Sequence, residues 1–172
     1  QQLGVTDTDL SAHIGPYQDW LAAGHHGELD YMAKHGSKRW VADELIGGTL
    51  RVISLRMDYF TDPHSPQDQL NRRDKAYISR YTLGRDYHKL IRSRLKKLIQ
   101  FIREQAEDFE FRAFVDSAPV LERAFAQKAG LGWFGKNAMI INRGAGSWFF
   151  LGEIFTDLPL PLDKPYEKEH CG

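Results

Sequence analysis

The spacing of apolar residues changes several times along this chain, and each change predicts a different element. In the N-terminal third, Tyr17, Trp20 and Leu21 are spaced to share one face of a helix. From residue 49 to 60 apolar and polar residues alternate instead, which predicts a strand with one buried face. Two prolines between residues 61 and 69 predict a surface loop.

The strongest helical pattern covers residues 85–103, where apolar residues form one stripe and basic residues occupy the opposite side. Residues 109–115 alternate again and predict a second strand, which ends at Asp116. A further helix is expected from Ser117, as its N-cap, to about Lys128. These elements place Asp116 between a strand and the helix that follows it.

Residues 139–141 and 147–155 predict two more strands joined by a short turn, and three prolines within residues 158–168 predict an extended linker. Strands and helices do not alternate regularly as βαβ units. The chain is therefore expected to form an α+β fold, with a mainly antiparallel or mixed sheet flanked by helices. We expect residues 1–157 to form one domain, and residues 158–172 to form a linker and the start of another.

Charge is unevenly distributed, although the formal net charge of the 172 residues is zero. Residues 71–103 contain eleven Lys and Arg but only two Asp, a net charge of +9, so the rest of the chain carries −9. Because phosphates respond to the local potential, the neutral total does not exclude a polyanionic partner; the alternative is a solvated helix face. No apolar run approaches the roughly 20 residues that a membrane span needs, so no membrane partner is expected.

Several common catalytic and metal sites are excluded. The single cysteine, Cys171, rules out an intrachain disulfide and a zinc site with several cysteines. His25, His26 and His35 lack the spacing of a metal site and are interpreted as surface or capping residues. The nucleophile motif Gly-x-Ser-x-Gly is absent.

The segment 130–135 matches the pattern G-x-G-x-x-G, but the expected helix precedes it and a strand follows, the reverse of a dinucleotide site. We interpret the glycines as allowing a tight bend and the close approach of a bulky ligand. Asp116 is either a simple N-cap or a proton donor, since a helix dipole lowers the pKa of a carboxyl and burial raises it. Lys136 either points into the same crevice or is an exposed turn residue.

Several long motifs resemble those of the bacterial epoxyqueuosine reductases, in the same order and over nearly the whole chain. These motifs occupy residues 20–32, 80–81, 84–89, 115–123, 129–137 and 146–153. The resemblance implies cytoplasmic reduction of epoxyqueuosine to queuosine at the wobble position of a tRNA anticodon. It also implies a fold like that of the cobalamin-processing chaperone and, more distantly, of the flavin nitroreductases.

The resemblance assigns roles to individual residues. Asp116 matches the family's proton donor, which protonates the oxygen as the carbon–oxygen bond breaks, and His88 and Arg123 match polar positions of the substrate pocket. The positions that match cobalamin contacts are Arg39, Ser79, Asp116, Lys136, Ile140 and Leu151. The aromatic residues Trp133, Trp148, Phe149 and Phe150 are expected to supply an apolar wall that excludes water.

Further partners follow from the same resemblance. The basic segment would contact the anticodon stem-loop of tRNA, and electrons would come from a flavodoxin or ferredoxin through two 4Fe–4S clusters in a ferredoxin-like domain; the protein is expected to be a monomer. Cys171 matches the first cluster ligand, but the family's later cysteines are absent, and one thiolate cannot hold such a cluster. We therefore expect the chain to bind cobalamin but not to turn over by itself with physiological reductants.

Three other interpretations remain open at this stage. The chain could be a cobalamin carrier or chaperone without catalysis, or a flavin enzyme of the nitroreductase kind. A simple tRNA-binding module would explain the basic segment, but it leaves Asp116 and the glycine turn without a purpose. Replacing Asp116 would separate an enzyme from a carrier, because only the enzyme needs its proton.

Overall fold

The alternating segment around residue 53 forms the second strand of a four-stranded antiparallel sheet, in a computed structural model that describes residues 2–60, 66–106, 108–166 and 170–171. In spatial order the strands are β1 (Gln2–Thr6), β2 (Arg51–Asp58), β6 (Phe149–Thr156) and β3 (Phe111–Phe114). A separate small hairpin pairs β4 (Trp133–Phe134) with β5 (Ile140–Ile141). The expected combination of helices and antiparallel strands is confirmed.

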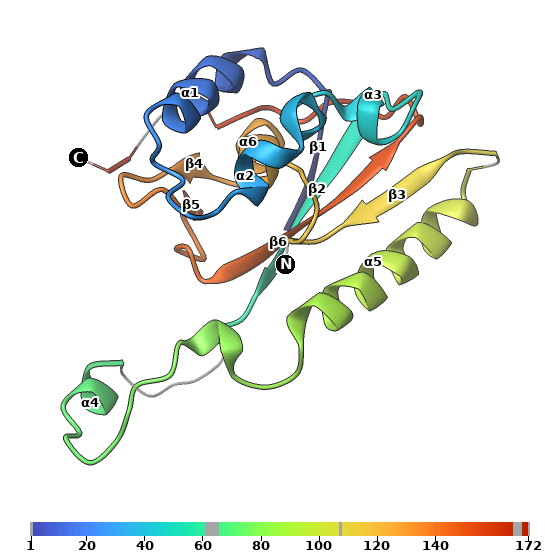
Figure 1. Ribbon diagram of the computed structural model, residues 1–172. Coiled ribbons are helices and arrows are strands. Elements are labelled where there is room, and N and C mark those ends of the chain that lie inside the picture. Colours follow the sequence, from blue (N-terminus) through green and yellow to red (C-terminus); the bar gives the residue numbers. More distant parts are fainter. Residues whose placement is uncertain (1, 61–65, 107, 167–169, 172) are drawn as a thin grey trace.

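Helices cover both faces of the sheet (Figure 1). The long helix α5 (Tyr87–Arg103) lies along one face, while the short helix α4 (Pro66–Leu70) projects away from the body. The helices on the other side are α1 (Ser11–Ala22), α2 (Tyr31–Lys34), α3 (Ala42–Leu45) and α6 (Glu122–Lys128). Two 3-10 turns span Gly36–Arg39 and Arg80–Thr82. Of the loop expected at residues 61–69, the first five residues lie outside the described part of the chain.

Helix α5 forms where the sequence predicts it. The Asp86 side chain caps it by accepting the His88 N–H at 2.9 Å. Its apolar stripe is buried against the sheet through Ile91, Leu95 and Ile99. Each such side chain stabilises the fold by about 1.5–3 kcal/mol through the apolar surface it removes from water. Gly152 of β6 allows the close contact, because a Cβ there would lie 3.1 Å from a methyl group of Ile91.

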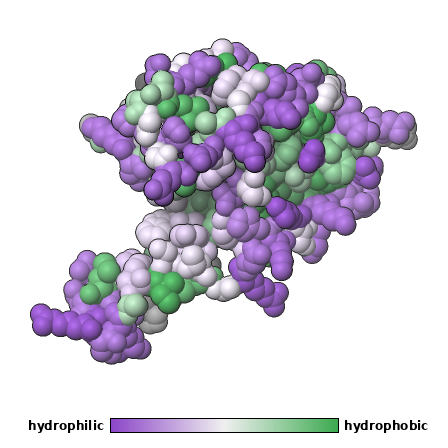
Figure 2. Space-filling view, in the orientation of Figure 1, coloured by the Kyte–Doolittle hydropathy of each residue, from purple (hydrophilic) through white to green (hydrophobic). Residues whose placement is uncertain are grey.

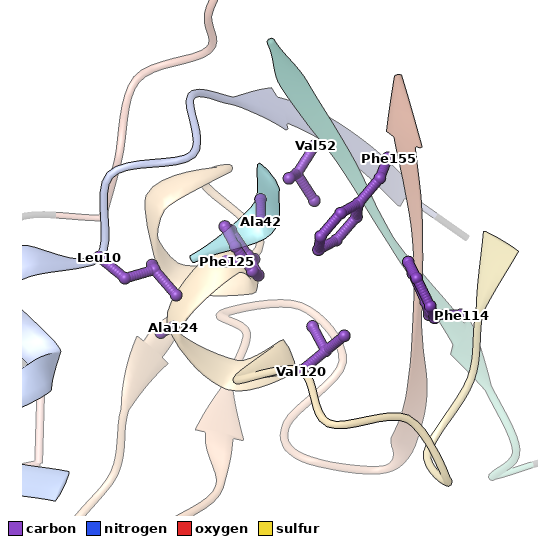
Figure 3. Close-up of a cluster of buried hydrophobic side chains, with 8 residues drawn as sticks. All are labelled: Leu10, Ala42, Val52, Phe114, Val120, Ala124, Phe125 and Phe155. Atoms are coloured by element: carbon purple, nitrogen blue, oxygen red, sulfur yellow. The ribbon is translucent and has the colours of Figure 1, made fainter. Parts of the chain in front are cut away.

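The core on the other face joins α6 and α3 to the sheet (Figure 3). Phe125 of α6 and Phe155 of β6 meet edge to face, with ring centroids 5.5 Å apart. Their neighbours in this cluster are Leu10, Ala42, Val52, Phe114, Val120 and Ala124. This packing fixes α6 against the sheet, and with it the loop that connects β3 to α6.

The prediction that a helix begins at Ser117 is wrong. The helix begins at Glu122, and Ser117 caps nothing; its hydroxyl is hydrogen-bonded to the Val115 carbonyl instead. The reason lies in Asp116, whose φ of +48° is left-handed and turns the chain away from the direction of β3. A short irregular loop therefore separates β3 from α6.

Two further expectations about turns are corrected. The strand at 140–141 does not pair with β6, because it forms the hairpin with β4, a strand that the sequence pattern did not predict. The glycines between 130 and 135 make room for the protein's own chain rather than for a ligand. A Cβ at Gly132 would lie 2.2 Å from the Ile141 carbonyl oxygen, and one at Gly130 would lie 2.5 Å from that of Lys164.

The edges of the sheet hold two more features. Strand β1, also missed by the pattern, pairs with β2 and packs on α6, where a Cβ at Gly4 would overlap the Ala129 carbonyl oxygen. The proline-rich segment is extended over its described residues, as expected, and it lies against β1. The Asp163 N–H donates to the Val5 carbonyl at 2.9 Å, and its carboxylate accepts the Val5 N–H at 2.8 Å.

Candidate functional site

Asp116 lies at the surface end of β3, with its side chain 56% exposed. Its left-handed backbone is uncommon for a residue with a side chain and costs roughly 1–3 kcal/mol. The Asp116 N–H donates to Oε1 of Glu122 at 2.7 Å. The residue is therefore not a helix N-cap, and its carboxylate is directed to other partners.

Two adjacent residues of the first turn of α5 meet one oxygen of Asp116. The Tyr87 hydroxyl donates to Oδ2 at 2.5 Å, and Nε2 of His88 lies 3.1 Å from the same atom. Burial, and then the hydrogen bond to Asp116, raise the pKa of Tyr87 well above its ordinary value, so the phenol stays protonated and donates. The structure thus brings His88, which is expected at a polar position of the substrate pocket, into contact with Asp116.

The imidazole of His88 bridges two carboxylates. Its Nδ1 lies 3.1 Å from Oδ1 of Asp86, while Nε2 faces Asp116. A neutral imidazole carries only one N–H, so two such contacts need either an imidazolium or one protonated carboxyl. Asp86, His88 and Asp116 thus form a continuous line of groups along which a proton can pass.

Aromatic rings continue the surface beside these groups. The rings of Tyr87 and Phe150 stack with centroids 4.2 Å apart and planes 7° from parallel. Tyr59 lies 4.7 Å from Phe150 and 6.1 Å from Trp148, measured between centroids. Exposed large apolar side chains near this cluster are Phe60, Tyr81 and Trp148. The result is an aromatic surface, adjacent to Asp116, on which a flat ligand can stack.

The expected wall of four aromatic residues is only half correct. Trp148 and Phe150 belong to the aromatic surface, but Phe149 points to the opposite side of β6 and is buried in the core beside Ile140. Trp133 packs against Tyr166 and His170 instead. Successive side chains of a strand point to opposite faces, which explains why Phe149 and Phe150 lie on opposite sides of β6.

The matched cofactor positions fall into two groups. Ile140 is buried, and Leu151 packs against the same small apolar cluster. Ser79 and Lys136 are exposed. Arg39 is buried, and its guanidinium donates to the carbonyls of Met32 at 2.8 Å and Tyr31 at 2.5 Å. Contact of these residues with a cofactor stays a prediction.

Arg123 and Cys171 also have partners within the chain. The Arg123 guanidinium donates to the Ala138 carbonyl, which ties α6 to the turn between β4 and β5. The indole N–H of Trp133 lies 3.4 Å from the Cys171 sulfur. Among the described residues, no group of three or more His, Cys, Asp and Glu side chains could hold a metal ion.

The basic residues of α5 lie on its solvent face, and hydrophilic side chains cover this part of the molecule in Figure 2. The exposed basic residues of the helix are Lys89, Arg92, Arg94, Lys96, Lys97 and Arg103. Arg92 donates to the Ser117 hydroxyl at 3.3 Å, which joins this face to the Asp116 loop. No helix in the described part of the chain is long and apolar enough to cross a bilayer.

Sequence reasoning missed two glutamates behind the site, Glu122 and Glu153. Glu122 accepts the Asp116 amide, and Glu153 is fully buried on the central strand β6. The signal that could have identified Glu153 is a charged residue within the apolar run from 149 to 155, because buried glutamates are rare unless they are paired.

Comparison with known proteins agrees with the motifs. The family model "Epoxyqueuosine reductase QueG, DUF1730" matches residues 39–117. An epoxyqueuosine reductase of Pseudomonas aeruginosa is 59% identical over all 172 residues, which make up 48% of that protein. The chain belongs to the epoxyqueuosine reductase family. It spans about half the length of the curated relatives that it matches.

Solved structures of this family share the fold. The epoxyqueuosine reductase from Streptococcus thermophilus superposes with a TM-score of 0.85 at 26% identity, over 98% of this chain and 45% of that one. An epoxyqueuosine reductase solved with an epoxyqueuosine-modified stem loop of tyrosine tRNA gives a TM-score of 0.81 at 22% identity, over 97% of this chain and 44% of that one.

Proposed function

We propose that this chain is the part of an epoxyqueuosine reductase that binds the modified nucleoside and delivers a proton to it from Asp116. The observation that carries the proposal is the meeting of the Tyr87 hydroxyl, the His88 imidazole and the Asp116 carboxylate at one oxygen atom, beside an exposed aromatic surface. The names of the relatives supply the substrate, and the geometry supports a proton donor.

The chemistry of the reaction requires such a donor. Converting an epoxide into a double bond removes one oxygen as water, and this consumes two electrons and two protons. Asp116 protonates the oxygen as its bond to carbon breaks, and the proton returns to Asp116 through His88 from the side of Asp86. Tyr87 keeps the Asp116 carboxyl oriented through its hydroxyl.

The residues present fit a cobalamin cofactor. The described residues offer no set of ligands for a bare metal ion, whereas a corrin brings its own equatorial nitrogen ligands and needs mainly a dry, flat surface. The candidates for holding the macrocycle are the matched positions Lys136, Ile140 and Leu151, of which the last two lie on the side of β6 away from the aromatic surface, with Arg39 and Ser79 as further candidates. When bound, a low-valent cobalamin supplies the electrons.

A tRNA stem-loop is the proposed macromolecular partner. The exposed basic face of α5 carries six cations and is joined to the Asp116 loop through Arg92. A relative of the same fold has been solved with an epoxyqueuosine-modified stem loop. Electrons would come from a flavodoxin or ferredoxin through 4Fe–4S clusters in a following domain. Cys171 would be the first ligand of these clusters.

The test is the variant Asp116→Asn, in the chain joined to the iron–sulfur domain that the proposal requires. Epoxyqueuosine reduction should fall by about 10²–10⁴-fold, the usual value of a general acid, while cobalamin is retained after desalting. The control Asp19→Asn changes an exposed carboxylate of α1 and should leave the rate unchanged.

Unchanged reduction by Asp116→Asn would contradict the proposal. Retention of cobalamin by a wild-type protein that reduces nothing would favour the carrier, and retention of FMN in place of cobalamin would favour the nitroreductase interpretation.

A further inference from the structure

Glu153 is a carboxyl group without access to water. It lies in the middle of the sheet, its side chain fully buried, opposite Ser54 of β2 and Phe114 of β3. The Ser54 hydroxyl donates to Oε1 at 3.4 Å, but no described residue donates to Oε2. An ionised carboxylate in this place would carry a large desolvation cost, so the second oxygen needs an explanation.

Protonation of Glu153 explains why its second oxygen has no donor, because a carboxylic acid needs an acceptor for its O–H rather than a donor. Glu122 is the neighbouring acid that acts directly on Glu153, so it is the acceptor available to this O–H. Burial, and then the neighbouring charge of Glu122, raise the pKa of Glu153 well above its ordinary value. Glu153 is therefore neutral at physiological pH, and Glu122 carries the charge of the pair.

Glu122 connects this buried acid to the surface loop. It is the first residue of α6, and its Oε1 accepts the Asp116 N–H at 2.7 Å. That bond stabilises Asp116 in its left-handed conformation and so offsets the backbone strain there. The same carboxylate thus interacts with the buried acid and accepts a hydrogen bond from the loop.

We propose that Glu122 and Glu153 form a proton-sharing latch that positions Asp116 for the proposed reduction: with one proton the pair holds the Asp116 amide through a charged acceptor, and with two it holds the amide more weakly. This inference rests on the proposed function, since it explains how the proton donor is kept in place. Glu122 and Glu153 are positioning residues, because they act on the substrate only through Asp116.

The groups that face the pair set the pH at which the second proton binds. The charge of Asp116 in the loop disfavours the charge of Glu122. Glu153 of β6 and Arg123 of α6 favour it, and the charge of Glu122 in turn raises the pKa of Tyr87 of α5. Burial, followed by the charge of Asp116, raises the pKa of Glu122 to about 7. The hydrogen bond from the Asp116 N–H therefore weakens as the pH falls through neutrality.

Nitrogen-15 NMR of the Asp116 amide tests the latch without any cofactor or turnover. In the wild type the amide proton should resonate downfield at alkaline pH, because it is bonded to a carboxylate. It should move upfield, with a midpoint near 7, as Glu122 takes up a proton. Glu122→Gln keeps an acceptor of the same shape but should abolish this titration.

Two more variants complete the design. Glu153→Gln still donates a hydrogen bond to Glu122 and should keep the titration, whereas Glu28→Gln, an exposed control between α1 and α2, should match the wild type. In the reductase assay the acidic limb of the pH–rate profile should disappear in Glu122→Gln. An Asp116 amide that does not titrate, or that titrates equally in Glu122→Gln, would overturn the latch.

The two proposals fail in different ways. If the amide titrates with Glu122 but Asp116→Asn reduces epoxyqueuosine normally, the proposed function is wrong and the coupling between the carboxyl groups stands. If Asp116→Asn is inactive but the amide does not respond to Glu122, the latch is wrong and the proposed function stands.

Discussion

The two sides of the Asp116 loop use the same chemical groups for opposite purposes. On the exposed side, the Asp116 carboxylate meets Tyr87 and His88 where a ligand can reach it. On the buried side, the backbone of Asp116 is held by Glu122, which in turn meets the fully buried Glu153. The two sides differ in whether water has access to the carboxyl group. An exposed carboxylate can exchange protons with a substrate, while a buried one stabilises a conformation and changes its protonation reluctantly.

The largest effect that separates the two sides should come from His88. The variant His88→Ala removes the proposed route by which a proton returns to Asp116, so kcat should fall by about 10²-fold. Because the side chain is half-buried and contacts two carboxylates, the free energy of unfolding should fall by roughly 1 kcal/mol. Turnover assays and urea unfolding measure the two quantities, with the exposed His35→Ala as control. A loss of unfolding free energy as large as the roughly 2.7 kcal/mol that a 10²-fold fall in kcat represents would contradict this prediction.

The buried side should dominate the dependence of stability on pH. The pKa of Glu122 is raised in the folded state from an ordinary 4.5 to about 7, so the folded protein binds the proton more tightly than the unfolded chain. The resulting stability is present below pH 4.5 and is lost as the pH rises through about 7, amounting to about 3 kcal/mol. Urea midpoints across this range should show the loss in the wild type but not in Glu122→Gln.

A smaller effect should distinguish the hydroxyl of Tyr87 from its ring. Tyr87→Phe removes the hydrogen bond to Asp116 but keeps the stacking on Phe150, so about 1 kcal/mol of interaction is lost. We expect a severalfold slower reduction and an unchanged fold by circular dichroism. Slower reduction with normal substrate affinity would place the hydroxyl in orientation of the acid; unchanged kinetics would show that His88 alone suffices.

The smallest effect should come from the solvent face of α5, more than two helical turns beyond His88. Lys96→Gln and Lys97→Gln should each weaken tRNA binding mildly and reduce the slope of log affinity against log salt by about one. The control Lys34→Gln removes an exposed cation of α2, on the other side of the sheet. Equal slopes in all three variants would exclude this face as a phosphate contact.

Local pattern was sufficient for the elements that bury one regular face. The stripe of α5, the alternation of β2 and the apolar run of β6 appear in the structure close to their predicted ends, because side-chain period follows directly from backbone geometry. The glycine run and Ser117 were misinterpreted for a related reason. Whether a glycine faces a ligand or Ile141 depends on a hairpin between residues that the pattern did not pair.

The sequence by itself determined the α+β class and the position of the long basic helix, and its resemblance to the family singled out Asp116 as the proposed proton donor. Only the tertiary structure decided what surrounds Asp116: Tyr87 and His88, 29 and 28 residues away, and the buried Glu153 behind Glu122. The physical reason is that protonation depends on burial and on neighbouring charges. Both arise only when β6 and α5 pack beside the loop, so neither can be predicted from the periodicity of the sequence.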